Sequence, residues 1–359
     1  MKSFDEIFID KTKYGVKVQT SEYGEVGEHI IIDQGQEQVA GYTDREEGVF
    51  EEVPVIIFGD HTRAIKYVDV PFFLGADGVK VLRSKDENAN YKYLYYALKN
   101  AKIPNTGYNR HFKWLKEVHI NYPDSEKQAE IVEILDKVSS VIKKREDELS
   151  VLENLIKARF VEMFGDPILN PKGYDKESIK KHINLLSGYP FKSGQYVEDG
   201  VNICGGLIIM PQKIKWEECV HWSSTDGYEE YMLDENDIVM ALDRPWISEG
   251  FKIAKVDGEH LPALLIQRTA RIRAIDINQD YLYYSFIHGG FDRHSNVTGS
   301  LVPHISAKDI NSFEVMLPPI EIQNQFAAFV QQVDKSKFID IINLLKILLF
   351  FKRGMYYGN

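Results

Sequence analysis

Several loops of this sequence combine cationic side chains with hydroxyl, amide and imidazole groups. They occupy residues 58–66 (FGDHTRAIK), 106–116 (TGYNRHFKWLK), 187–193 (SGYPFKS), 243–246 (DRPW), 267–271 (QRTAR) and 298–306 (TGSLVPHIS). Arginine can form paired hydrogen bonds to base edges, and hydroxyl, amide and lysine groups bind phosphate oxygens. Aromatic side chains mixed with cations add contacts to grooves and to the backbone. These residue types predict contact with nucleic acid.

The candidate contact residues all come from these loops. In the first half of the chain they are His61, Thr62, Arg63, Lys66, Tyr108, Asn109, Arg110, His111 and Lys113. In the second half they are Lys192, Ser193, Arg244, Trp246, Arg268, Arg271 and His304. We expect Arg63, Arg110, Arg244 and Arg268 to be the principal contacts, because arginine is the commonest reader of base edges.

Each loop also has an ordinary structural interpretation. Asp60 and Thr62 could cap backbone amides in a polar turn, and the aromatic rings of residues 106–116 could belong to a core. Arg271 and Arg273 alternate along a predicted strand, so both point to one face, where carboxylates on a neighbouring strand could pair with them. The sequence leaves these alternatives open.

Motifs for catalysis are absent from the sequence. No two of the 25 glycines have the G-x-G spacing of a phosphate-binding loop, and there is no Walker sequence. The adjacent prolines Pro318 and Pro319 follow Leu317, whereas amino-methyltransferases have Asn or Asp there. No lysine stands two residues after a carboxylate, as metal-dependent nucleases require, and the 10 histidines include no H-x-x-x-H pair. We therefore predict no catalytic residue and no metal ligand in this chain.

Composition indicates a soluble protein. Apolar residues make up 44% and charged residues 27% of the chain, and no segment approaches the roughly 18 apolar residues of a membrane span. The first ten residues contain acids where a signal peptide has an apolar core. Cys204 and Cys219 match no paired-cysteine motif, so we expect reduced, structural thiols. We expect a cytoplasmic protein that does not bind membranes.

The net charge of −11 hides strong segregation of charge. Residues 88–116, 178–197 and 261–275 contain basic side chains and no acid, whereas residues 216–237 contain acids and no base. The average charge argues against general binding of polyanions, but local patches can still bind them.

A long repeat organises the chain. The residues Tyr93-Leu94-Tyr95-Tyr96 recur as Tyr281-Leu282-Tyr283-Tyr284, Thr106-Gly107 recurs as Thr298-Gly299, and 118–128 (VHINYPDSEKQ) matches 313–323 (FEVMLPPIEIQ). The period is too long for a solenoid repeat. It predicts a duplicated domain that presents two similar surfaces.

Two long helices follow the repeated segments. The first is predicted over Glu126–Phe164, where apolar residues recur at alternating steps of three and four, as in a coiled coil. The second is predicted over Glu321–Tyr357, with a ladder that ends in Ile341, Leu344, Leu348 and Phe351. Neither helix can bury its apolar stripe alone, so we expect them to pack on each other in antiparallel orientation.

The predicted fold class is α+β. The expected domains are a globular domain over residues 1–125, a helix over 126–165, a second globular domain over 166–320 and a second helix over 321–359. In this arrangement two similar domains are separated by an antiparallel coiled coil and related by a pseudo-twofold axis.

The helical segments carry a family resemblance. Residues 128–135 (QAEIVEIL), 157–167 (KARFVEMFGDP) and 318–325 (PPIEIQNQ) resemble the conserved regions of the specificity (S) subunits of type I restriction–modification systems. The loops 58–63 (FGDHTR), 75–78 (GADG) and 243–245 (DRP) are also similar to sequences in that family's target recognition domains. The resemblance covers essentially the whole chain.

The resemblance implies a non-catalytic subunit that reads a bipartite double-stranded DNA target, with one half of the target for each domain. It also implies two methyltransferase (modification) subunits bound to the helices and a restriction endonuclease/translocase subunit in the full complex. S-adenosylmethionine, ATP and Mg²⁺ are expected on those partner subunits and no cofactor in this chain. The alternatives are a coiled-coil adaptor that binds proteins and a self-sufficient nuclease or methyltransferase.

Overall fold

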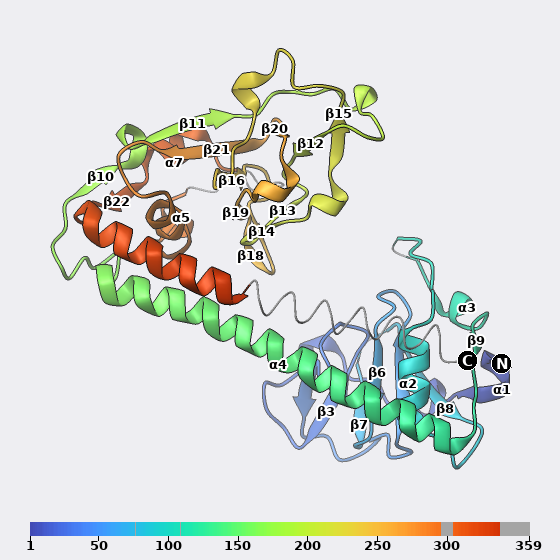
Figure 1. Ribbon diagram of the computed structural model, residues 1–359. Coiled ribbons are helices and arrows are strands. Elements are labelled where there is room, and N and C mark those ends of the chain that lie inside the picture. Colours follow the sequence, from blue (N-terminus) through green and yellow to red (C-terminus); the bar gives the residue numbers. More distant parts are fainter. Residues whose placement is uncertain (76, 108, 296–303, 338–359) are drawn as a thin grey trace. The chain divides into compact units, whose positions relative to one another are not determined.

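The computed structural model describes residues 1–75, 77–107, 109–295 and 304–337. The chain divides into two compact units, Met1–Lys144 (unit 1) and Arg145–Asn359 (unit 2). Three predictions concern other residues: Tyr108, the repeated Thr298-Gly299 and the second helix beyond Lys337 lie outside the described residues. The elements are labelled in Figure 1.

Unit 1 contains two main sheets (Figure 1). The four-stranded sheet has the antiparallel order β2 (Phe8–Asp10), β8 (Val79–Ser84), β5 (Val55–Gly59), β6 (Ile65–Val68). The three-stranded sheet has the order β4 (Gly41–Thr43), β3 (His29–Ile32), β7 (Phe72–Leu74), with β3 and β7 parallel. The remaining elements are β1 (Lys2–Ser3), which pairs with β9 (His119–Ile120), and helices α1 (Phe4–Ile7), α2 (Tyr91–Lys99) and α3 (Phe112–Leu115).

Unit 2 repeats this plan in the same chain order. Its four-stranded sheet is β11 (Ile183–Ser187), β21 (Thr269–Ala274), β16 (Ile238–Ala241), β19 (Ile253–Lys255). Its three-stranded sheet is β15 (Val220–Trp222), β12 (Val201–Cys204), β20 (Ala263–Leu265), and β12 and β20 are parallel. The strand pair β10 (Lys176–Ser178) and β22 (Glu314–Met316) corresponds to β1 and β9, and α5 (Gln279–His288) corresponds to α2.

Unit 2 adds elements that unit 1 lacks within the described residues. They are the hairpins β13 (Ile209–Met210) with β14 (Lys213–Ile214) and β17 (Trp246–Ile247) with β18 (Gly250–Phe251), and the short helix α6 (Phe291–His294). The short helix α7 (Ala307–Ser312) precedes β22 as α3 precedes β9. Short 3-10 helices connect the strands of both units at Thr12–Tyr14, Thr20–Glu22, Ile179–Lys181, Ser193–Gln195, Trp216–Glu218, Glu229–Tyr231 and Gly258–His260.

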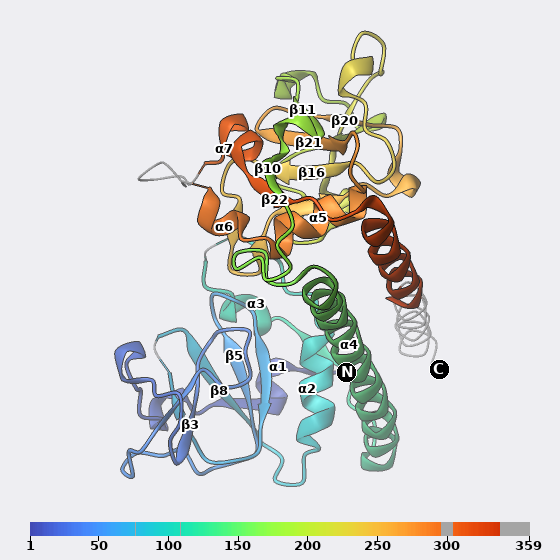
Figure 2. The same cartoon turned by 90° about the vertical axis from the view of Figure 1, so that its left-hand side faces the viewer.

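Strand alternation explains how the layers pack. In β5, Ile56 and Phe58 face a core shared with α2, whereas Val55 and Ile57 face a core shared with the three-stranded sheet. Neighbouring side chains of a strand point to opposite faces, so β5 is buried on both sides and consists of apolar residues and glycine. Figure 2 shows α2 beside this sheet. The equivalent strand β16 divides its residues between two cores in the same way.

The repeated residues make equivalent contacts in the two units. The Tyr93 hydroxyl donates to the carbonyl of Asn121 at 2.6 Å, and the Tyr281 hydroxyl donates to that of Met316 at 2.8 Å. The Gln128 amide donates to the Pro123 carbonyl at 2.8 Å, and the matching bond from Gln323 to the Pro318 carbonyl is 2.7 Å long. The predicted duplication of an α+β domain is therefore confirmed, and the repeat marks where each domain joins its helix.

The first long helix is α4 (Ser125–Phe164), which is 40 residues long and matches its predicted bounds. It ends at Gly165, whose φ of 82° favours glycine, and Lys172 donates to the carbonyls of Glu162 and Met163. Residues 320–337 form the described part of the second helix. Within unit 2 this helix runs antiparallel to the end of α4 (Figure 1), and Phe326 contacts Phe160 and Phe164 at centroid distances of 5.5 and 5.4 Å.

None of the helices in the described part of the chain combines the length and the apolar character that crossing a membrane requires.

Replacing Gln323 tests the junction between domain and helix. Its side chain also accepts a bond from the backbone of Asn278 at 2.8 Å, so Gln323→Ala leaves one buried and one partly buried backbone group without these partners. We expect a loss of about 1–3 kcal/mol in the free energy of unfolding, measured by urea denaturation. The exposed Gln325 on the same helix is the control, and Gln325→Ala should cost less than about 0.5 kcal/mol. Equal effects of the two substitutions would contradict the assigned role.

Candidate nucleic-acid interface

All of the predicted contact loops except residues 187–193 gather at one end of the four-stranded sheet in each unit. The unit 1 loop cluster comprises the described residues of 59–64, 75–78 and 103–113, and the unit 2 loop cluster comprises 242–246, 266–269 and 304–306. Backbone bonds join the segments in equivalent ways. Asp60 N–H donates to Gly78 and Leu242 N–H to Arg268, at 2.7 and 2.9 Å. His111 N–H donates to Asp60 and Ile305 N–H to Leu242, at 2.7 and 2.8 Å.

Three of the four principal candidate arginines have a left-handed backbone. The φ angles of Arg63, Arg244 and Arg268 are 61°, 46° and 63°. Such values are uncommon for residues other than glycine, asparagine and aspartate, and each costs roughly 1–3 kcal/mol. Residues held in this conformation concentrate at binding sites, where the surrounding fold over-determines them. The placement of three arginines in this way supports a binding role for the turns that carry them.

Asp60 and Thr62 stabilise the turn of the unit 1 loop cluster. The Asp60 carboxylate is buried and accepts from the backbone N–H of Phe112 at 2.8 Å. Thr62 Oγ1 accepts from the N–H of Ala64 and donates to the carbonyl of Gln34. The capping alternative is therefore confirmed for these two residues. Arg63 donates to the carbonyl of Ile103 at 3.2 Å and is partly exposed, as is His61, whose N–H donates to the Gln34 side chain at 3.2 Å.

Burial corrects the prediction for three candidates. Lys66 is 3% exposed and lies 3.5 Å from Asp33, and burial lowers the pKa of its ammonium group. His111 is fully buried, with its imidazole near the carbonyl of Asp60 and the hydroxyl of Thr106. Arg271 is 6% exposed. A side chain covered by protein cannot reach a base or phosphate directly, so these three residues belong to the interior of the fold, and His111 is the one of the three that bonds within a loop cluster.

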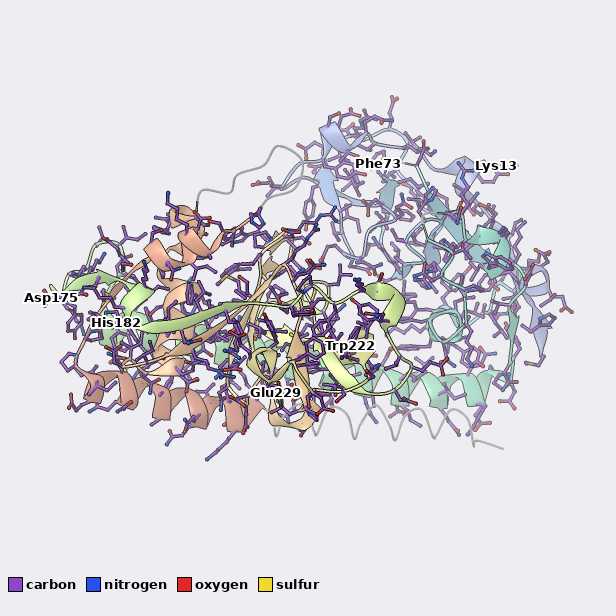
Figure 3. The ribbon with its side chains drawn as sticks, turned by 90° about the horizontal axis from the view of Figure 1, so that it is seen from above. Lys13, Phe73, Asp175, His182, Trp222 and Glu229 are labelled. Atoms are coloured by element: carbon purple, nitrogen blue, oxygen red, sulfur yellow. The ribbon has the colours of Figure 1, made fainter. Side chains whose placement is uncertain are left out.

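Of the two strand arginines of unit 2, Arg273 follows the structural alternative of pairing with carboxylates, whereas Arg271 is buried and bonds to backbone carbonyls. Arg271 donates to the carbonyls of Glu230 and Met232, both at 2.9 Å. Arg273 pairs with Asp237 at 2.5 Å and with Asp234 at 2.7 Å. The partners belong to the acidic segment 216–237, on which Trp222 and Glu229 are labelled in Figure 3. Part of the basic segment 261–275 therefore pairs with part of the acidic segment 216–237 within the fold.

Asp243 brings two predicted contact residues of unit 2 together. Its carboxylate lies 3.0 Å from the Arg268 guanidinium and 2.8 Å from the His304 imidazole. The Arg268 side chain is nevertheless 74% exposed, and Arg244 beside it is exposed as well. Trp246 is less available, because its ring stacks on Phe251 at 5.0 Å. Lys192 and Ser193 are exposed at the 3-10 helix Ser193–Gln195.

The other candidates of unit 1 lie on the surface. Asn109, Arg110 and Lys113 are exposed, and the Lys113 ammonium lies 4.8 Å from the Trp114 ring. The half-buried Phe112 packs against the core and has the ammonium groups of Lys80 and Lys116 over its ring, at 4.9 and 5.2 Å. A cationic surface therefore flanks the unit 1 loop cluster.

Sequence reasoning missed two residues that bond to the loop clusters. Gln34 accepts bonds from the turn after β5, as described above. Lys252 is 7% exposed, and its ammonium donates to the carbonyl of Gly206; burial, and then the charge of Arg244, lower its pKa. A usable signal existed for Gln34, since it follows an apolar strand as the predicted loops do. Lys252 had none, because its burial arises from tertiary packing.

The described residues contain no group of side chains suited to bind a metal ion, and their two cysteine thiols are not activated. Among them, no three His, Cys, Asp or Glu side chains are grouped to hold a metal ion. Both cysteines are free thiols; Cys204 is buried and Cys219 is partly exposed. Burial raises the pKa of both thiols, which disfavours the reactive thiolate form.

Comparison with known proteins decides the family. The model of the type I restriction modification DNA specificity domain matches residues 6–154 and again 198–348. The chain belongs to this family. The two matched segments fall on the duplicated domains and their helices, so the resemblance predicted from the helical motifs is confirmed, together with the fold class.

Individual proteins to which the chain is similar are specificity subunits of the same family. The chain is 31% identical over 192 residues to the specificity subunit of type I restriction enzyme EcoAI from Escherichia coli, covering 51% of this chain and 31% of that protein. It is 26% identical over 352 residues to the EcoR124I/EcoR124II specificity subunit from Escherichia coli, covering 90% and 83%. The fold resembles that of the type I S subunit from M. genitalium, with a TM-score of 0.55 and 15% identity over 97% and 92% of the two chains.

Substitution of a buried and an exposed arginine tests which of the two stabilises the fold. Arg271→Ala removes a buried guanidinium that satisfies two carbonyls, so we expect it to lower the free energy of unfolding by about 1–3 kcal/mol. Arg268→Ala removes an exposed side chain and one surface ion pair, and should change stability by less than about 1 kcal/mol. Urea denaturation measures both. A larger loss for Arg268→Ala would show that the assignment is wrong.

Proposed function

We propose that this chain is the DNA-reading subunit of a type I restriction–modification complex, and that each unit reads one half of a bipartite duplex target. The observation that carries the proposal is the repetition of one fold with equivalent loop clusters, whose turns hold Arg63, Arg244 and Arg268 in left-handed conformations. Membership of the DNA specificity family supports it.

The exposed arginines are proposed to read base edges in the major groove. A guanidinium can donate two parallel hydrogen bonds to the O6 and N7 atoms of guanine, and lysine, serine and asparagine side chains near it can bind phosphates and fix the register. Arg110, Lys113, Lys192 and Ser193 are exposed and suited to such contacts. Of the buried residues, His111 would instead hold the unit 1 loop cluster through Asp60 and Thr106, whereas Lys66 and Arg271 pair with residues outside the clusters.

The chemistry is proposed to come from partner subunits. The sequence has none of the motifs expected for methyl transfer or nuclease activity, so two methyltransferase subunits would supply S-adenosylmethionine and its active sites. A restriction endonuclease/translocase subunit would supply the sites for ATP and Mg²⁺. The chain itself would select the DNA site and hold no cofactor, and the complex would act in the cytoplasm.

The helix α4 is proposed to set the gap between the half-sites. It is a single helix of 40 residues that connects the two units, about 60 Å long at 1.5 Å per residue. A stiff connector fixes half-site spacing by geometry, as dimer geometry does in other DNA-binding proteins. Methyltransferase subunits would bind along the same helical region.

The acidic character of the chain agrees with a complex in which other subunits make most of the contacts to DNA phosphates. With a net charge of −11, the isolated chain would gain little from release of counterions. Partner subunits would provide most phosphate contacts, so binding by the whole complex should be strong and should weaken steeply with salt. Binding by the chain alone should be weak.

Substitution of single arginines tests the assignment of half-sites. Arg63→Ala should relax one position in one half of the methylated motif, and Arg268→Ala one position in the other half, each at a cost of about 1–3 kcal/mol in discrimination. Methylome sequencing of a host that carries each variant complex measures the motif. Arg45, which pairs with Glu22 near the opposite end of β3, is the control, and Arg45→Ala should leave the motif unchanged. Uniform weakening of all sites would instead indicate contact with phosphate.

Lengthening the connector tests the spacing role. Four helical residues inserted after Lys144 add about 6 Å to α4. At about 3.4 Å per base pair, the gap between the half-sites should grow by about two base pairs while both half-sites stay the same. The methylome of the host reports the gap directly. If the gap stays unchanged in an active complex, α4 does not set the spacing.

A further inference from the structure

A further loop, residues 205–208, adjoins the unit 2 loop cluster and contributes to none of the predicted contacts. It follows β12 and has the sequence Gly-Gly-Leu-Ile. A methyl group placed on Gly206 would lie 3.7 Å from Ala241 Cβ and 3.8 Å from the carbonyl oxygen of Arg268. The loop therefore lies in contact with the turn that holds Arg268 and with the end of β16.

Lys252 fixes this loop against the same turns. Its ammonium donates to the carbonyl of Gly206, and its backbone N–H donates to the carbonyl of Pro245 at 2.7 Å. Burial, and then the charge of Arg244, lower the pKa of Lys252. Because Lys252 is 7% exposed, it works from beneath the surface and links the loop 205–208 to the turn at Arg244.

The loop presents one apolar side chain to solvent. Leu207 is 89% exposed, whereas the next two residues, Ile208 and Ile209, are 4% and 0% exposed. The N–H groups of Ile208 and Ile209 both donate to the carbonyl of Gly205, at 3.1 and 3.2 Å, which closes a tight turn. The turn therefore directs Leu207 outward on a rigid support rather than on a loose segment.

Unit 1 places the corresponding loop at the corresponding position. The strands β3 and β12 end at equivalent positions of their sheets, since Ile32 pairs with Leu74 and Cys204 with Leu265. Two residues later, Gln34 accepts bonds from His61 and Thr62 in the turn after β5. Two unlike sequences thus add a loop to the same place on each cluster, which argues that the loop belongs to the binding surface.

We infer that Leu207 is a specificity-determining residue that contacts a base of the half-site read by unit 2, and that Lys252 is its positioning residue. This inference rests on the proposed function. An exposed leucine on a loop that adjoins the turns of Arg244 and Arg268 offers a contact that a guanidinium group does not provide, an apolar contact with the C5-methyl group of thymine in the major groove. The expected ligand is therefore a thymine within duplex DNA.

The test uses the whole complex and the motif that it methylates in a host. Leu207→Ala should relax one A·T position of one half-site, reducing discrimination there about tenfold, and should leave the other half-site intact. Leu169 is the matched control, because it is a leucine of unit 2 that is 79% exposed and follows α4. Leu169→Ala should leave every position unchanged.

A second measurement identifies the methyl group. When uracil replaces thymine at the affected position, the wild-type complex should lose about as much affinity as Leu207→Ala causes, and the Leu207→Ala complex should lose no more. Equal losses for both complexes would overturn the methyl contact. Lys252→Met should reproduce the relaxed position, whereas Lys252→Arg, which retains a donor, should restore it at least in part.

The outcomes separate this inference from the function on which it rests. If the wild-type complex recognises no bipartite sequence, the proposed function fails. If it recognises one and Leu207→Ala leaves every position as strictly specified as before, the proposed function stands and the role of Leu207 is refuted.

Discussion

Burial of one strand on both of its faces constrains the whole structure. In unit 1, alternate residues of β5 fill a core with α2 and a core with the three-stranded sheet, and β16 does the same in unit 2. The side chains of such a strand are not available to a ligand, so binding residues must lie in the turns at its ends. The turns that follow β5 and β16 carry Arg63 and Arg244, and the neighbouring turns and loops pack around them. The same constraint, applied twice, produces two equivalent loop clusters.

Local patterns in the sequence predict much of this fold. The apolar ladder of α4 and the glycine after it define the helix, because helical periodicity and capping depend on nearby residues. The repeat of Tyr93 and Tyr281 marks equivalent hydroxyl bonds to equivalent carbonyls. Since both copies use the same residue types at the same junction, the sequence alone predicts the duplication.

The role of individual site residues depends on tertiary packing and was less predictable. Lys66, His111 and Arg271 are of the types that bind nucleic acid, yet each is buried in the interior of the fold. The left-handed backbone of Arg63, Arg244 and Arg268 has no sequence signal, because arginine does not favour it. The shared carboxylate of Asp243 joins Arg268 and His304 from separate segments, so only the fold shows the contact.

Direct observation of DNA on the loop clusters tests the account most directly. A structure of the complete complex with its methylated target should place the guanidinium groups of Arg63 and Arg268 within hydrogen-bonding distance of bases in different half-sites, with α4 spanning the gap between them. The account would be contradicted if the DNA followed other faces of the two units, or if both loop clusters contacted the same half-site.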